Sequence, residues 1–238
     1  MEHNGRNGDQ IIPDIVIRRL PIYVRTLRQI QSSGTQTVSS DELAERIGVT
    51  AAQIRRDLSY FGRFGKQGKG YDVGSLLQQI QQILNLDRHW DVALVGYGHL
   101  GRAIASYRGF EPSSFRISAI FDRTSERNGQ VTSSGIEVQH SSLIPEVVRQ
   151  KGVQIGIVAV PATDAQDVTD LLVKGGVRAI LNYAPVTLKV PEGVWVREID
   201  PISAMQSMTY YLEREDSRPE STDNADLRVP NPDAADGD

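Results

Sequence analysis

Cysteine is absent from the 238 residues of the sequence, and histidine is scarce. Without thiols there can be no disulfide, no thiol catalysis, no thiol-based redox sensing and no cysteine-ligated zinc or iron–sulfur centre. The four histidines lack metal-ligand spacing, so no metal site is expected; they are His3, His89, His99 and His140. The longest apolar run, at 155–162, is far shorter than the ~20 residues that a membrane span needs. The first ten residues are polar and carry no secretory signal, so we expect a cytoplasmic protein without a membrane partner.

Charge is distributed unevenly along the chain, whose formal net charge is −4. Residues 1–74 carry eleven Lys or Arg and eight Asp or Glu, whereas residues 213–238 carry three and nine. A basic first third is typical of proteins that bind an acidic partner such as nucleic acid. On charge alone, chance scatter of surface residues explains the same excess.

Hydrophobic periodicity predicts an α/β protein with a helical first domain and a doubly wound, Rossmann-like parallel sheet built from βαβ units. Leu76, Leu77 and Ile80 lie at helical spacing between the two, so the link is a connecting helix rather than a flexible linker. The polar acidic end of the chain is typical of disorder. The expected segments are a flexible N-terminus (1–10), the helical domain (11–74), the connecting helix (75–90), the βαβ domain (91–199), a C-terminal helix (200–213) and the acidic tail (214–238).

The first domain begins with a helix whose apolar residues recur at helical spacing from Leu20 onward. Pro21 must lie in the first turn of this helix or kink it, because proline lacks the N–H that an interior position donates. A second helix begins after Ser39, which forms a capping box with Glu42, and stops at Gly48.

A third helix starts with the same signal, since Thr50 caps it and Gln53 completes a second capping box. Two short capped helices joined through one glycine describe a helix-turn-helix, although an αα-hairpin within a core has the same pattern. Ile54 and Leu58 point to the core. Side chains that can reach base edges or phosphates, or are small enough for close approach, give the expected DNA contacts: Ser40, Ala52, Gln53, Arg55, Arg56, Ser59 and Tyr60.

A glycine-rich basic stretch follows the third helix at 62–71. Its glycines permit the positive φ angles of a tight β-hairpin, which would lay Arg63, Lys66 and Lys69 along a phosphate backbone or in a minor groove. Considered alone, the stretch is equally explained as a surface loop with ordinary lysines. Together with the capped helices, it predicts a winged-helix domain that binds double-stranded DNA.

The second domain opens with a buried strand at 91–96 that enters a glycine turn and then a helix. The turn has the GxGxxG pattern in the context of a Rossmann dinucleotide site, and it comprises Gly96, Tyr97, Gly98, His99, Leu100 and Gly101. Gly96 makes the tight turn, Gly98 lets the backbone approach a pyrophosphate, and Gly101 permits close helix–strand packing. A glycine turn that holds no ligand is the alternative.

Asp122 ends the next predicted strand, 21 residues after Gly101. In a Rossmann unit this carboxylate accepts a hydrogen bond from the ribose 2′-hydroxyl. It would repel the 2′-phosphate of NADP, which Arg123 compensates only in part, so NAD(H) is the expected ligand. Later strands end at the same edge of the sheet, and the residues expected on the nicotinamide side are Val160, Pro161, Asn182, Tyr183 and Ala184.

Motifs of hydrolases and metal enzymes are missing, and no acid–base pair can be placed beside the expected nicotinamide. His99 lies within the phosphate loop and His140 follows a different strand. We therefore expect no catalytic residue and no enzyme. The alternatives are an NAD-dependent dehydrogenase with an appended helical domain, a CoA-binding regulator and a purely structural DNA-binding protein.

The C-terminal helix has a strong start signal, since Asp200 caps it and Pro201 takes its first position. Its apolar stripe comprises Ile202, Met205, Met208, Thr209 and Leu212. This stripe must bury itself either against the protein's own sheet or against a partner subunit. Proteins that bind palindromic half-sites are two-fold symmetric, which favours the partner.

From Ile12 to Leu212 the chain resembles Rex, a family of redox-sensing transcriptional repressors. The stretches that carry the resemblance are Arg19-Leu20-Pro21, the run at 53–62 with Tyr71, the loop at 96–101 with Tyr107, Phe121-Asp122, the run at 181–185, and Asp200. The resemblance implies a homodimer with an N-terminal winged helix, a Rossmann domain and a C-terminal helix swapped into the partner. It implies repression of respiratory and fermentative genes that is relieved when NADH rises, with NAD⁺ compatible with operator binding. It also implies a nucleotide-dependent intersubunit contact between Arg19 and Asp200, with Tyr107 nearby.

Overall fold

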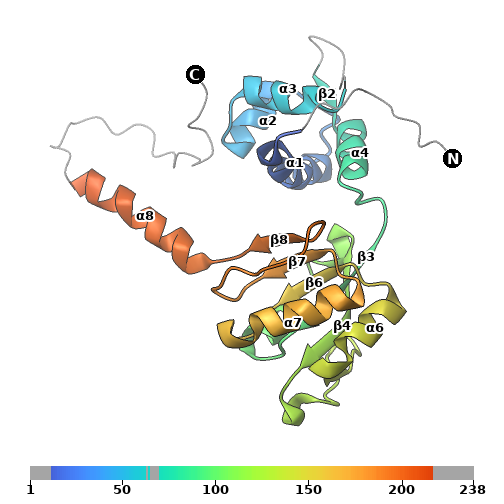
Figure 1. Cartoon of the computed structure of the whole chain (residues 1–238). Coiled ribbons are helices and arrows are strands. Elements are labelled where there is room, and N and C mark those ends of the chain that lie inside the picture. Colours follow the sequence, from blue (N-terminus) through green and yellow to red (C-terminus); the bar gives the residue numbers. More distant parts are fainter. Residues whose placement is uncertain (1–11, 63, 65–69, 217–238) are drawn as a thin grey trace. The chain divides into compact units, whose positions relative to one another are not determined.

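Helices dominate the chain before Asp87 and a parallel sheet dominates it after Arg88, so the chain forms two units (Figure 1). The computed structural model describes residues 12–62, 64 and 70–216, with side chains up to Leu212. The expected wing cations Arg63, Lys66 and Lys69 lie outside the described residues, as do residues 1–10 and the tail after 216.

The first unit packs its helices and a small antiparallel sheet around one core. Its elements are α1 (Asp14–Ser32), β1 (Thr37–Val38), α2 (Ser40–Ile47), α3 (Ala51–Ser59), β2 (Tyr71–Asp72) and α4 (Val73–Ile83). The helix expected at 75–90 is α4, which begins at Val73 and buries Leu76 and Ile80 in this core, in contact with α1. It is therefore part of the first unit and not a separate connector, because an amphipathic helix is stable where its apolar face is covered.

Pro21 lies in the interior of α1, which corrects the expectation of a first-turn position. The helix begins seven residues earlier, at Asp14, directly after Pro13. Leu20 and Tyr23 beside the proline are fully buried. This packing offsets the backbone hydrogen bond that proline cannot donate, so the helix continues through it.

The helix starts around the helix-turn-helix follow the predicted capping with one exception. The capping box between Ser39 and Glu42 is complete at α2. At α3, Thr50 accepts from the Gln53 backbone N–H as predicted. The Gln53 side chain, however, donates through its NH₂ group to Asp57 one helical turn later, and its second capping-box hydrogen bond, from the Thr50 N–H, is not formed.

The second unit contains a parallel sheet with strand order β5-β4-β3-β6-β7-β8. Its strands are β3 (Trp90–Val95), β4 (Phe115–Asp122), β5 (Val138–His140), β6 (Ile155–Val158), β7 (Ala179–Asn182) and β8 (Trp195–Glu198). The chain order reverses between β3 and β6, which are neighbours in the middle of the sheet. In doubly wound sheets, ligands bind at the carboxyl ends of the strands at this switch point.

Alternating side chains of the strands serve two cores, one on each face of the sheet. Phe121 and Val158 pack with α6 (Ile144–Lys151) and α7 (Ala162–Gly175) on one face (Figure 1). Leu94 and Ile120 pack with Ile104 of α5 (His99–Ser106) on the other. Short 3-10 turns occur at Glu111–Ser113, Ser125–Arg127 and Ser141–Leu143.

The helix α8 (Pro201–Asp216) ends the described chain. Asp200 caps it as predicted, since its carboxylate accepts from the backbone N–H groups of Ile202 and Ser203. Every residue from 201 to 212 is exposed, so the apolar stripe does not bury itself against the protein's own sheet.

Candidate functional site

The glycine turn after β3 has the geometry of a dinucleotide loop. Gly96 has a φ of +99°, and a Cβ there would lie 2.3 Å from the Ala159 carbonyl oxygen. A Cβ at Gly101 would lie 1.9 Å from the Gly96 carbonyl oxygen, so both positions exclude any side chain. Gly98 differs, because the nearest atom to its Cβ position is 3.9 Å away, on Arg127.

The start of α5 is open to an anion. Gly98 is its N-cap and supplies no side-chain hydrogen bond to the first turn. His99 and Leu100 in that turn are exposed, and Tyr97 before it is half-buried. Free N–H groups and the positive end of the helix dipole favour a phosphate at this position.

Asp122 lies beside the glycine turn at the end of β4 and is 4% exposed. Its carboxylate accepts from the Tyr97 N–H at 2.6 Å, from the Thr124 N–H at 2.8 Å and from Arg127 Nη1 at 2.9 Å. Burial raises the pKa of this carboxyl, but the hydrogen bonds from Thr124, Tyr97 and Arg127 outweigh it, so the pKa lies below its ordinary value of 3.8. The group is thus held ionised at the edge of the site.

Arg127 is a component of this site that the sequence analysis missed, and the predicted cation, Arg123, is engaged elsewhere. Arg123 pairs with Asp164 of α7 at 2.7 Å, whereas Arg127 pairs with Asp122. A basic residue in the short loop just after the strand-ending acid was the available signal.

The residues expected on the nicotinamide side lie at the ends of two neighbouring strands, β6 and β7. Val160 contacts the glycine turn, since one of its methyl carbons lies 2.9 Å from the Cβ position of Gly96. Pro161 directly precedes α7, and Tyr183 is half-buried after β7. Asn182 is fully buried, and its amide exchanges hydrogen bonds with the backbone of Ala184, which makes it the anchor of this loop.

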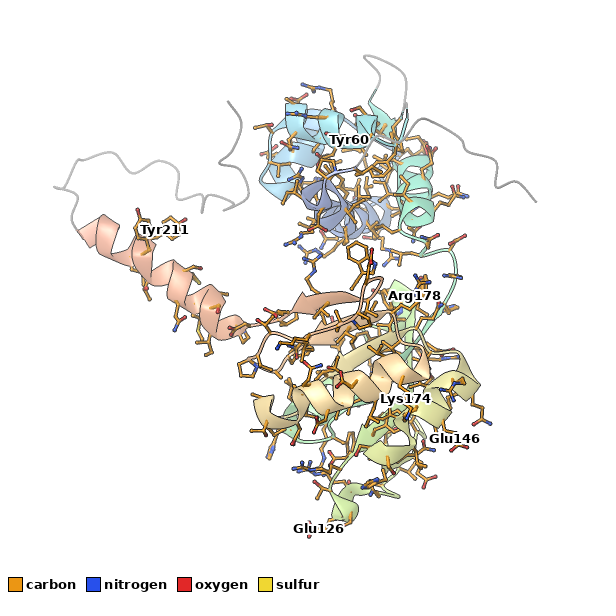
Figure 2. The ribbon with its side chains drawn as sticks, viewed as in Figure 1. Tyr60, Glu126, Glu146, Lys174, Arg178 and Tyr211 are labelled. Atoms are coloured by element: carbon orange, nitrogen blue, oxygen red, sulfur yellow. The ribbon has the colours of Figure 1, made fainter. Side chains whose placement is uncertain are left out.

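The exposed face of α3 matches the expected DNA-contacting face. Figure 2 shows its side chains around the labelled Tyr60, which follows the helix directly. Ile54 and Leu58 are buried below. Ser40 is half-buried and lies 3.4 Å from the Tyr71 hydroxyl. The exposed residues are Ala52, Arg55, Arg56 and Ser59, with Gln53 and Tyr60 half-buried.

A buried ion pair lies beneath this face and was not anticipated. Arg19 of α1 donates to both oxygens of Asp57 in α3, at 2.7 and 2.9 Å, and the Tyr23 hydroxyl donates to the same carboxylate. Burial and the hydrogen bond to Asp57 raise the pKa of Tyr23 well above its ordinary value. The signal was available, since position 57 is one helical turn after the core residue Ile54.

The contact expected between Arg19 and Asp200 of two subunits stays a prediction. In this chain Arg19 is paired with Asp57, and Asp200 caps α8. Tyr107 is 65% exposed, and its ring packs edge-on against Phe110 with centroids 5.5 Å apart.

Among the described residues, no group of three or more His, Cys, Asp or Glu could hold a metal ion. Within the same ranges, none of the helices combines the length and apolar character that crossing a membrane requires.

A helix-turn-helix face on one unit and a dinucleotide-type turn at the switch point of the other define a class of DNA-binding regulators with a Rossmann-like domain. Two family models match the chain: "Putative DNA-binding protein N-terminus" at residues 11–59 and "CoA binding domain" at residues 87–186. The redox-sensing transcriptional repressor Rex of Roseiflexus sp. (strain RS-1) is 57% identical over 85% of this chain and 92% of its own length. Rex of Streptomyces coelicolor is 42% identical over 94% of this chain and 86% of its own. The chain belongs to the redox-sensing transcriptional repressor Rex family, as the resemblance predicted.

Solved structures agree with this membership and confirm the expected fold class. The crystal structure of RSP in complex with β-NAD⁺ and operator DNA has a TM-score of 0.82 and 38% identity, covering 87% of this chain and 95% of that one. RSP in complex with β-NADH has a TM-score of 0.78 and 36% identity, covering 87% and 97%.

Proposed function

We propose that this protein is a DNA-binding repressor that senses the NADH/NAD⁺ ratio, and that NADH releases it from operator DNA. One observation carries the proposal: a single chain contains both a helix with exposed arginines and a dinucleotide-type turn. In this turn, Gly96 and Gly101 have no space for a side chain. Its site of action would be the cytoplasm, where the chromosome and the NAD(H) pool meet.

The nucleotide would bind across the glycine turn. The N-terminus of α5 and the open space at Gly98 suit the pyrophosphate. Asp122 suits the ribose, because it is an ionised carboxylate beside the glycine turn and can accept a hydrogen bond from a hydroxyl. Bound nicotinamide supplies the signal, since its two redox states differ by a hydride and one positive charge. A 2′-phosphate would lie against the Asp122 carboxylate, which favours NAD(H) over NADP(H).

Operator DNA would be contacted by the exposed face of α3, with Ser40 at the start of α2. Residues near the N-terminus of a recognition helix contact base edges, and Arg55 and Arg56 can reach guanine or phosphate. Arg63, Lys66 and Lys69 of the wing would add phosphate or minor-groove contacts.

The active form would be a homodimer joined through α8. The stripe of Ile202, Met205, Met208 and Leu212 is exposed in the single chain. A groove of about 360 Å³ on the sheet is lined mainly by apolar side chains from β6, β7 and β8. Placing α8 of a second copy over this groove would bury both surfaces, and light scattering should then give twice the chain mass of 26.3 kDa.

We expect a regulator and not an enzyme, because the relatives that define the family are named as transcriptional repressors. The match to the CoA-binding domain model makes CoA the second ligand to test.

The deciding experiment measures the affinity for a Rex operator duplex at fixed salt while the NADH/NAD⁺ ratio is varied, with CoA and NADPH as separate additions. We expect affinity to fall 5- to 150-fold, about 1–3 kcal/mol, as NADH replaces NAD⁺. Affinity that ignores the ratio would remove the sensing proposal, and a response to CoA alone would replace the ligand. Consumption of NADH with small carbonyl substrates would instead indicate a dehydrogenase.

A further inference from the structure

The carboxylate of Asp57 is buried in the first unit, but it contacts Gln53, which lies on the face of α3 that would contact DNA in the proposed function. Asp57 is 0% exposed. Four donors surround it: Nε and Nη2 of Arg19, the hydroxyl of Tyr23, and Nε2 of Gln53 at 2.7 Å. An ionised carboxylate offers about four acceptor positions, so this group is saturated. Arg19 and Tyr23 come from α1, and Gln53 comes from the first turn of α3.

This arrangement fixes the orientation of the Gln53 amide. A carboxylate paired with a guanidinium can only accept hydrogen bonds, so Gln53 must turn its NH₂ group toward Asp57. Its carbonyl oxygen, Oε1, is then directed away from the buried charge. A glutamine without such a partner rotates freely and presents either end to a ligand.

Gln53 occupies the part of a recognition helix that approaches base edges. It is the third residue of α3, it is half-buried, and its neighbour Ala52 is small and exposed. In the major groove a carbonyl oxygen can accept only from an exocyclic amino group, N6 of adenine or N4 of cytosine. Guanine O6 and thymine O4 are acceptors and would face Oε1 unfavourably.

We propose that Asp57 is a positioning residue for base recognition: it holds the Gln53 amide so that Oε1 selects an amino-bearing base, adenine or cytosine, at one position of each half-site. The assignment rests on the proposed DNA-binding function and names a specificity determinant within it. Arg19 and Tyr23 fix the carboxylate from α1, so the preference depends on residues that never touch DNA.

The test is selection of bound duplexes from a pool with randomised central base pairs, using the full-length protein, followed by sequencing. Wild type should enrich a two-fold motif with adenine or cytosine at one position per half-site. Gln53→Met removes both ends of the amide and should lower that preference about fivefold. Asp57→Asn leaves Gln53 in place but replaces a group that only accepts with an amide that can accept or donate, so Gln53 is no longer held in one orientation. It should lower the preference at the same position by a similar factor. The salt dependence of binding by Gln53→Met should not change, because this variant removes no charge.

Gln78→Met is the matched control, since it makes the same substitution at an exposed glutamine of α4, which the proposed function does not place against DNA, and it should leave the preference at that position intact. An Asp57→Asn motif identical to that of wild type would overturn the proposal. Failure of wild type to enrich any duplex would instead overturn the DNA-binding function, and this inference with it.

A second measurement covers the case in which Asp57→Asn does not fold. In ¹⁵N-labelled wild type, the side-chain amide protons of Gln53, identified by their loss in Gln53→Met, should exchange with water more slowly than those of the exposed Gln78. Equal exchange would show an amide that is not held, which overturns the proposal without any change at Asp57.

Discussion

The two units offer different groups to their proposed ligands: side chains of α3 in the first unit, and in the second mainly the backbone of the glycine turn, with the carboxylate of Asp122 beside it. Arg55 and Arg56 stand on the solvent side of α3, and the core lies beneath them. At the glycine turn, by contrast, the surface proposed to hold the pyrophosphate is backbone, and the close packing there leaves no space for a Cβ at Gly96 or Gly101. We therefore expect changes in DNA binding to be separable from changes in stability in the first unit. In the second, nucleotide binding and stability should both depend on Gly96 and Gly101.

Each unit contains one residue that does not fit this contrast between exposed side chains in the first unit and tightly packed backbone in the second. In the first unit, Asp57 is buried, but it accepts a hydrogen bond from Gln53, which lies on the α3 face proposed to contact DNA. In the second, Gly98 belongs to the turn but has open space around its Cβ position. These exceptions supply matched variants with which the comparison can be tested.

The largest effect is expected from Gly101→Ala, because its Cβ would lie 1.9 Å from the Gly96 carbonyl oxygen. The clash must move α5 or the turn, which should lower the free energy of unfolding by about 3 kcal/mol and abolish NADH binding. Both tryptophans of the chain, Trp90 and Trp195, lie in the second unit, so urea unfolding followed by their fluorescence reports on that unit.

Gly98→Ala is the matched control for this variant. Its φ of −76° suits alanine and its Cβ has no neighbour closer than 3.9 Å, so the unfolding midpoint should stay at the wild-type value. NADH binding by calorimetry should still weaken at least tenfold, because the methyl group would occupy the approach of the pyrophosphate. Equal loss of stability in both variants would contradict the separate roles assigned to the two glycines.

The next largest effect is expected from Arg56→Ala, which should weaken operator binding without lowering stability. Removal of an exposed arginine should weaken operator binding by about 1–3 kcal/mol while changing the free energy of unfolding by less than ~0.5 kcal/mol. Fluorescence anisotropy with operator and with unrelated duplex measures the first, and calorimetric unfolding measures the second. Equal weakening on both duplexes would make Arg56 a phosphate contact, and a large drop in stability would contradict the separation of function and fold.

Periodicity and capping signals were sufficient to predict the architecture, because they record local physics. The capping box at Ser39 and the glycine that ends α2 both follow from short-range pattern. The expected connecting helix at 75–90 belongs to the first unit instead, as α4. Its sequence pattern shows that it has an apolar face but not that α1 covers this face.

The polar contacts could not be predicted from the sequence, because side-chain partners are chosen by distance in the fold. Arg127, and not Arg123, pairs with Asp122, since the loop after β4 turns one guanidinium back and leaves the other facing α7. The pair between Arg19 and Asp57 joins residues 38 positions apart. Gln53 was assigned to a capping box because the acceptor four residues later was not recognised as buried.

The smallest effect concerns Asp122 and the pH dependence of the second unit. Since its pKa is lowered in the folded protein, the ionised group stabilises the fold above the unfolded value near 3.8, and this contribution is lost as the pH falls below it. Asp122→Asn should therefore lower the free energy of unfolding at pH 7 by about 1–2 kcal/mol, and the gap to wild type should close below pH 4. Tryptophan-detected urea unfolding from pH 7 to pH 3 measures this. Asp91→Asn, which removes one partner of a surface ion pair with Arg116, should change the stability by less than ~0.5 kcal/mol at pH 7. A gap for Asp122→Asn that stays constant with pH would mean that the hydrogen bonds from Tyr97, Thr124 and Arg127 do not depend on the charge of the carboxylate.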